Sequence, residues 1–156
     1  IVACLVGSEM CIRDSPGVPK RVVLASLLGL IPILIGLIST FNIGISESTR
    51  KGFIEIALIY SGFILSFVSG CAFYVASLER EKELLLWFSI LPVLLALLSF
   101  IIPFMQSFVL ALGFLVILEI ERKLYKLGSL PKWWLNLRFP MTSIVVLLLI
   151  ILGFRT

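Results

Sequence analysis

The feature that most constrains this chain is a series of long apolar runs separated by short segments rich in charged residues. A transmembrane α-helix needs about 20 consecutive apolar residues, because the hydrocarbon core of a bilayer is about 30 Å thick. Hydrophobic residues make up 60% of the 156 residues, and the mean hydropathy is +1.18. A soluble domain contains only about 45–50% apolar residues. The sequence therefore predicts an all-α integral membrane protein without a separate soluble domain.

Five runs are apolar enough to be transmembrane helices. They cover residues 22–41, 53–78, 84–102, 104–120 and 139–154. The third and fourth runs form one stretch that is too long to cross the bilayer once, so we place a hairpin turn at Pro103. Because the fourth run is short, a re-entrant hairpin over residues 84–120 is the alternative to two full spans. We expect residues 16–156 to form a single bundle of five helices.

Three prolines interrupt these runs or their connections. Pro32 lies in the middle of the first run, Pro92 lies in the third, and Pro103 lies between the third and the fourth. Proline has no backbone N–H and cannot donate the hydrogen bond that a helix interior requires. We therefore predict a kink at each of the three positions.

Residues 1–15 do not follow the pattern of the rest of the chain. They lack the basic start and the uninterrupted apolar core of a targeting segment. Residues 4–15 resemble the translation of a transposase-library sequencing adapter, so we interpret residues 1–15 as a disordered artefact, with a genuine flexible tail as the alternative. Two cysteines, Cys4 and Cys11, fall in this segment and leave Cys71 alone. The remaining chain can therefore form neither an internal disulfide nor a cysteine-based metal site.

The residues that carry most known catalytic chemistry are scarce in this chain. It contains no histidine, which removes the commonest general base and the usual transition-metal ligand. The apolar runs contain isolated serines, but no nucleophile next to a base. We therefore expect a non-enzymatic protein with no catalytic residues, no metal and no cofactor.

Lysine and arginine are distributed unevenly over the connections. With five spans and without Arg13 of residues 1–15, nine of these residues lie on one face of the membrane and three on the other. The first face holds Lys20, Arg21, Arg80, Lys82, Arg122, Lys123, Lys126, Lys132 and Arg138, and the second holds Arg50, Lys51 and Arg155. The positive-inside rule places the richer face in the cytoplasm. We expect a bacterial inner-membrane protein with its amino terminus inside and its carboxyl terminus outside, which contacts lipid headgroups rather than nucleic acid.

Small residues recur every four positions in the second run, at Gly62, Ser66 and Gly70. Residues four apart lie on one face of a helix, and small side chains allow a neighbouring helix to approach closely. We expect this stripe to pack against another helix of the same chain, with Ser69 hydrogen-bonding across the contact. A homodimer interface and a substrate-lining face are the alternatives.

Trp133 and Trp134 precede the last run and lie between Lys132 and Arg138. Tryptophan rings favour the headgroup level of a bilayer, and neighbouring cations can reach lipid phosphates. We expect these four residues to anchor the chain at the cytoplasmic interface. The alternative is a site for a partner or for a specific lipid.

Glu119 and Glu121 close the fourth run next to Arg122 and Lys123. Residues three or four apart on a helix can form ion pairs. We therefore interpret both carboxylates as members of local pairs at the end of a helix. No carboxylate falls at the expected midplane of a span, so the sequence predicts no proton or cation relay.

Three segments carry a resemblance to a known family. They are residues 60–70, 89–92 and, most specifically, 130–142. Here the chain resembles domain-of-unknown-function family 3429, which includes bacterial inner-membrane proteins and is related to mitochondrial transmembrane protein 69. The resemblance covers most of residues 22–153 and implies a five-helix membrane protein. The chain departs from the family at Ala72 and Phe73, where the family typically has His-Trp.

Three classes of function fit these observations. We favour a non-enzymatic protein that packs with itself or takes part in the assembly of a membrane complex. A small transporter or channel subunit would need a polar groove near the midplane, for which the chain offers Ser66, Ser69 and Tyr74. An intramembrane enzyme would need a nucleophile with a base.

Overall fold

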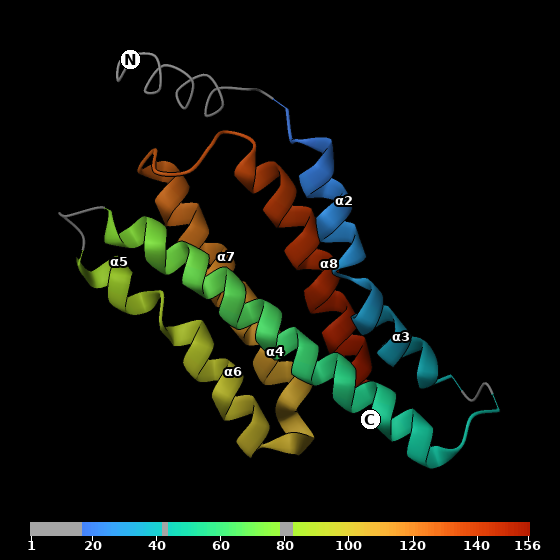
Figure 1. Ribbon diagram of the computed structural model, residues 1–156. Coiled ribbons are helices and arrows are strands. Elements are labelled where there is room, and N and C mark those ends of the chain that lie inside the picture. The colour runs from blue at the N-terminus through green and yellow to red at the C-terminus, as the bar shows by residue number, and fades with distance from the viewer. Residues whose placement is uncertain (1–16, 42–43, 79–82) are drawn as a thin grey trace, which may run out of the picture.

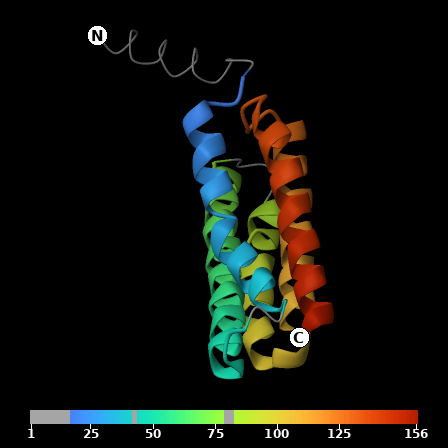
Figure 2. The ribbon, with the colours of Figure 1, turned by 90° about the vertical axis from the view of Figure 1, so that its right-hand side faces the viewer.

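The computed structural model describes residues 17–41, 44–78 and 83–156, in which every regular element is a helix. Figures 1 and 2 show one elongated bundle with its connections at the two ends. Five helical segments are long and apolar enough to cross a membrane: Lys20–Ser39, Glu47–Ser77, Glu83–Ile101, Pro103–Lys126 and Trp134–Arg155. The prediction of an all-α fold with five spans is confirmed. Residues 4–15, which resemble the adapter, lie outside the described residues.

The first and third spans each consist of two α-helices, and the fourth span begins with a turn of 3-10 helix. The elements are α2 (Lys20–Leu28), α3 (Ile31–Ser39), α4 (Glu47–Ser77), α5 (Glu83–Phe88), α6 (Leu91–Ile101), the 3-10 helix η1 (Pro103–Met105), α7 (Gln106–Lys126) and α8 (Trp134–Arg155).

The prolines coincide with the beginnings of elements. Pro32 lies in the first turn of α3, Pro92 lies in the first turn of α6, and Pro103 begins η1. The first amides of a helix have no partner within it, so a proline there removes no helical hydrogen bond. The first and third spans are therefore divided just before a proline. Pro140 differs from these three because it lies inside α8.

A hydrogen bond between spans stabilises the break before Pro92. The amides of Val93 and Leu94 both donate to the carbonyl of Ile90. The carbonyl of Ser89 instead accepts a hydrogen bond from the buried hydroxyl of Ser69 in α4. A polar contact of this kind between membrane helices satisfies a carbonyl that lipid cannot.

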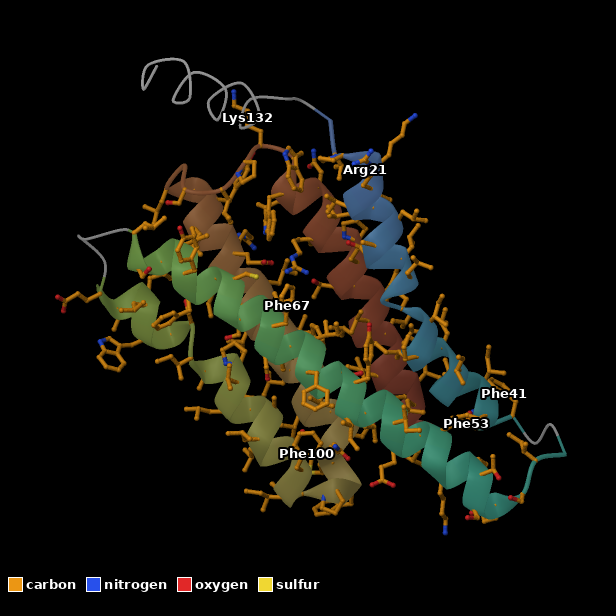
Figure 3. The ribbon with its side chains drawn as sticks, viewed as in Figure 1. Arg21, Phe41, Phe53, Phe67, Phe100 and Lys132 are labelled. Carbon is orange, nitrogen blue, oxygen red and sulfur yellow. The ribbon has the colours of Figure 1, made fainter. Side chains whose placement is uncertain are left out.

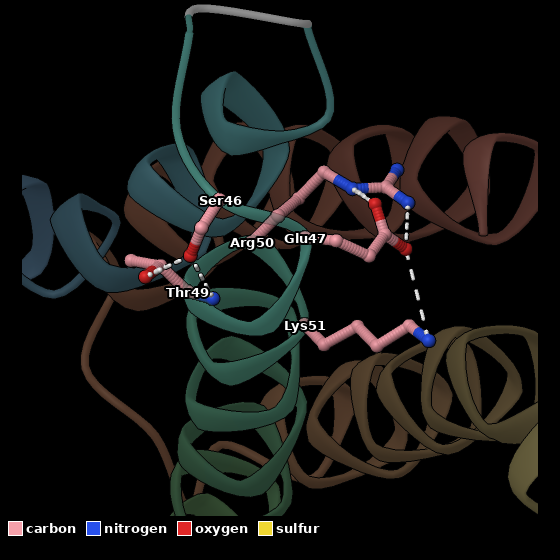
Figure 4. Close-up of polar contacts among 5 residues, drawn as sticks. All are labelled: Ser46, Glu47, Thr49, Arg50 and Lys51. Carbon is pink, nitrogen blue, oxygen red and sulfur yellow. Dashed lines mark hydrogen bonds and ion pairs between the residues drawn. The ribbon is translucent and has the colours of Figure 1, made fainter.

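The start of α4 is stabilised by residues of its own first turns (Figure 4). The hydroxyl of Ser46 accepts a hydrogen bond from the amide of Thr49 at 3.2 Å. Arg50 forms an ion pair with Glu47 at 2.6 Å, and Lys51 lies 3.7 Å from the same carboxylate. The cap satisfies a free amide, and an acidic side chain in the first turn favours the helix dipole.

The core of the bundle lies where α7 packs against α4 on one side and α8 on another. Leu65 of α4, Leu110 of α7 and Leu149 of α8 are each 0% exposed. α4 also contacts α3 and α6, and α7 contacts α6. Close packing is needed where α3 meets α4, because a Cβ atom at Gly36 would overlap the Cβ of Ala57.

The small-residue stripe of α4 does not pack as predicted. Gly62 is buried, and a Cβ there would lie 3.2 Å from the ring of Phe100. Ser66 is half-buried, whereas Gly70 is exposed and a Cβ there would have no atom within 4 Å. The expectation that Gly70 packs against a helix of the same chain is wrong. Two steps of four residues turn about 80° around a helix of 3.6 residues per turn, which carries Gly70 away from the buried face around Leu65.

Three helices extend several residues beyond the predicted apolar runs. α4 begins at Glu47 rather than at residue 53, α7 continues to Lys126 rather than to residue 120, and α8 begins at Trp134 rather than at residue 139. Helical backbone satisfies its own polar groups, so a helix has no need to end where the side chains become polar. An ion pair between Glu119 and Arg122 at 3.4 Å supports the additional turns of α7. The extensions bring the polar end of α7 beside the start of α8.

Candidate functional site

A buried carboxylate connects α7 to α8. Glu121 is only 2% exposed. Its Oε1 accepts a hydrogen bond from Nε1 of Trp134 at 3.1 Å and a second one from Nε of Arg138 at 3.0 Å. Its Oε2 has no hydrogen-bond partner among the described residues. A charge buried to this degree requires an opposite charge beside it, which Arg138 supplies.

The connection between the two helices determines this pairing. α7 ends in a Schellman motif: the amide of Ser129 donates to the carbonyl of Leu124 at 3.2 Å, and that of Gly128 donates to Tyr125 at 2.9 Å. Gly128 has a φ of +77°, a conformation that glycine adopts without strain. The chain therefore reverses within a few residues and directs α8 back along α7. Positions about equally far from the turn then face each other.

The sequence analysis missed the role of Glu121. Local pairing is correct for Glu119, which pairs with Arg122, but it is wrong for Glu121, whose ionic partner lies 17 residues further along the chain. A signal was present in the spacing. Glu121 follows the buried Ser107 and Phe114 at intervals of seven residues, which places all three on one face of α7.

Arg138 is held on two sides. Its Nε is bound by Glu121, and its guanidinium carbon lies 5.2 Å from the ring centre of Trp134, within the range of a cation–π contact. The hydrogen bond that joins this guanidinium to the described residues is made by Nε. The side chain of Arg138 is 22% exposed. The two terminal nitrogens of an oriented guanidinium are thus left for another acceptor.

The other two residues predicted to lie at the interface are placed differently. Trp133 is half-buried, and its ring centre lies 5.6 Å from that of Trp134. Lys132 is exposed. Figure 3 shows Lys132 and Arg21 at the same end of the bundle, where α2 and α8 begin. The four residues that were predicted to lie at the interface are therefore not in one place. Trp134 and Arg138 form a cluster with Glu121, whereas Lys132 lies at the basic end of the bundle.

A cavity of about 300 Å³ adjoins this cluster. α2, α3, α4, α7 and α8 all contribute to its walls, and Trp134 and Arg138 lie at its α8 end nearest the turn. Most of the lining side chains are apolar, and the hydroxyls of Ser26 and Thr142 add polar groups. The lining on α8 runs from Trp134 to Val145, a length on the order of 16 Å at 1.5 Å per residue. The cavity thus reaches from the basic end of the bundle into the apolar spans.

This arrangement combines an apolar cavity with one oriented cation. The volume of the cavity lies at the lower end of the range of about 300–1,000 Å³ that is usual for small-molecule sites. Among residues 17–41, 44–78 and 83–156, no group of three or more His, Cys, Asp or Glu side chains could hold a metal ion. The chemistry available at this site is recognition of a molecule with an apolar body and an acceptor at one end.

The fold and the site define a multi-pass, α-helical membrane protein with an apolar cavity next to its basic end. A family model described as protein of unknown function (DUF3429) matches residues 18–154. The chain therefore belongs to this family, as the resemblance implied. Comparison with curated proteins and with solved structures finds no match.

Proposed function

We propose that this protein is non-enzymatic and acts by holding one amphipathic molecule of its own bilayer in the cavity between α2, α4 and α8. The observation that carries the proposal is the combination of an apolar cavity with an anchored arginine at one end. Apolar walls suit a hydrocarbon chain, because the chain then keeps the environment that it has in the bilayer. A guanidinium suits the polar group of the same molecule.

The packing of α2 supports the proposal. None of the residues of α2 is buried, although α2 is part of a transmembrane span. Val22, Ala25 and Ser26 of α2 line the cavity. A lipid chain in this space would fill the gap between α2 and the rest of the bundle. The position of α2 would then depend on the bound molecule, which is one way for such a protein to take part in helix packing or in the assembly of a membrane complex.

A transporter or channel subunit is less well supported than a binding protein. A second cavity, of about 230 Å³, includes Arg50 and Gln106 in its lining and shares no lining residue with the first. Alternating access requires a site that opens toward both faces of the membrane. The first cavity is instead adjacent to one end of the bundle.

Lipid retention tests this function. The chain would be purified in a mild detergent and examined by native mass spectrometry, and we expect one retained lipid for each chain. Ala25→Trp should occupy the cavity and lower retention several-fold. Leu24→Trp is the matched control, because Leu24 is 59% exposed and does not line the cavity. Equal retention by both variants would refute the proposal.

We also propose that the basic end of the bundle faces the cytoplasm of a bacterial cell, with the amino terminus inside and the carboxyl terminus outside. The distribution of nine Lys and Arg residues against three supports this orientation. A reporter that is active only outside the cytoplasm should be active after Thr156 or within residues 42–52, and silent within 79–83. The reverse pattern would invert the orientation, and an even number of crossings would rule out five spans.

A further inference from the structure

The geometry around Arg138 points to the polar group of the bound molecule, and this inference rests on the proposed function. We propose that the cavity takes a glycerophospholipid of net negative charge, whose phosphate is bound by the terminal nitrogens of Arg138. Glu121 and Trp134 are positioning residues that hold the guanidinium in place. The acyl chain of the lipid lies along the apolar walls toward Val145.

Glu121 contacts the guanidinium of Arg138 through Nε. In a bidentate arginine–carboxylate pair, two N–H groups of the guanidinium donate to the two carboxylate oxygens. Here Oε1 of Glu121 takes Nε of Arg138 and also Nε1 of Trp134, while Oε2 takes no donor among the described residues. The carboxylate therefore holds Arg138 through Nε and takes neither terminal nitrogen, and Arg138 is one of the residues that line the cavity. That fork matches the spacing of two phosphate oxygens.

The charges nearby favour a lipid of net negative charge over a zwitterionic one. Glu121 and Arg138 neutralise each other, so the excess positive charge comes from the same end of the bundle. Arg21 lies there, at the beginning of α2 and next to Val22 of the cavity lining (Figure 3). Its charge attracts a headgroup whose net charge is negative and repels the quaternary ammonium of a choline headgroup.

The depth of the cavity favours a lipid over free phosphate. A phosphate ion would contact Arg138 and leave the apolar surface beyond it uncovered. The walls beyond Arg138 include Leu137, Met141 and Val145 of α8 and Phe114 of α7. These side chains offer nothing to an inorganic ion and suit hydrocarbon.

Competition between two lipids with identical acyl chains tests the inference. The protein would be placed in nanodiscs that contain equal amounts of phosphatidylglycerol and phosphatidylcholine, and the lipids that remain bound after transfer to detergent would be counted by native mass spectrometry. We expect the wild-type chain to enrich phosphatidylglycerol by about tenfold, the order of one charge–charge interaction near a protein surface, because both lipids carry the phosphate that Arg138 binds and only phosphatidylcholine carries a cation that Arg21 repels. Inorganic phosphate at millimolar concentration should leave this ratio unchanged, and displacement of the lipid by phosphate would overturn the assignment to a lipid.

Four variants separate binding from folding. Arg138→Met combined with Glu121→Gln removes the guanidinium without leaving a buried charge, and it should lower the retention of both lipids several-fold, because both carry a phosphate. Arg21→Gln should keep the retained lipid and abolish the preference for phosphatidylglycerol. Glu121→Gln alone keeps an oxygen that accepts from Arg138 and Trp134, so the preference should remain. Arg50→Met, at the other end of the bundle, is the control and should change nothing. A lipid retained without headgroup preference in the wild-type chain would overturn this inference and leave the proposed function intact, whereas loss of all retained lipid would overturn both.

Discussion

The two charged clusters of this bundle each contain a Glu–Arg pair and differ in almost everything else. At the start of α4, Glu47, Arg50 and Lys51 pair within two helical turns, and the side chain of Glu47 is 61% exposed. Between α7 and α8, Glu121 pairs with Arg138 across 17 residues, and the side chain of Glu121 is 3% exposed. The first cluster is held by local geometry, and the second exists only because two helices pack.

This difference determines what each cluster contributes. An exposed pair competes with water and salt, so its net contribution to stability is small. A buried pair has lost its hydration, and removing one partner leaves a charge that nothing solvates. The buried cluster is therefore the one whose substitution should affect the whole bundle, and it is also the one that adjoins a cavity.

The largest effect is expected from Arg138→Met. The substitution keeps much of the side-chain volume but leaves Glu121 buried without its cation, which should lower the free energy of unfolding by about 3–5 kcal/mol. Thermal unfolding in detergent would measure the loss. Arg50→Met is the matched substitution in the exposed cluster and should leave the midpoint almost unchanged. Equal losses for the two variants would mean that burial does not distinguish the clusters.

A double-mutant cycle should show the same contrast as a coupling energy. Combining Glu121→Gln with Arg138→Met should cost less than the sum of the single substitutions, with a coupling of about 0.5–3 kcal/mol, because the second change removes the uncompensated charge. The cycle with Glu47→Gln and Arg50→Met should be additive within error. Additivity at Glu121 and Arg138 would show that the two side chains do not depend on each other.

The same distinction explains how much of the fold could be predicted from the sequence. The five spans follow from hydropathy, which depends on each segment alone, and three segments, of which residues 130–142 are the most specific, carried the family resemblance. The partner of Glu121 could not be chosen from the sequence, because Arg122 and Lys123 are adjacent and Arg138 becomes a neighbour only after the chain reverses at Gly128. The cavity has walls from five helices, so no segment predicts it.

Gly36 and Gly70 differ in the same way as the two charged clusters, because one contacts another helix and the other does not. Gly70 belongs to a stripe that is visible in the sequence, yet it is exposed, whereas Gly36 belongs to no such stripe and lies against Ala57 and the carbonyl of Phe53. Gly36→Leu should force α3 away from α4 and lower the free energy of unfolding by about 1–3 kcal/mol. Gly70→Leu should be tolerated in the same thermal assay. If Gly70→Leu left stability intact but abolished self-association, the stripe would be a contact between copies of the chain.

The smallest effect is expected from Glu47→Gln in the exposed cluster. The carboxylate of Glu47 forms ion pairs with Arg50 at 2.6 Å and with Lys51 at 3.7 Å. Water reaches this exposed carboxylate, and salt screens both pairs. The hydroxyl of Ser46 still caps the helix after this substitution, because it binds the amide of Thr49 independently of Glu47. Glu47→Gln should therefore lower the thermal midpoint only slightly at low salt and not measurably at high salt, whereas Ser46→Ala should cost about 1 kcal/mol through loss of the cap. A greater loss for Glu47→Gln than for Ser46→Ala would show that this cluster, like the one around Glu121, depends on contacts beyond its own helix.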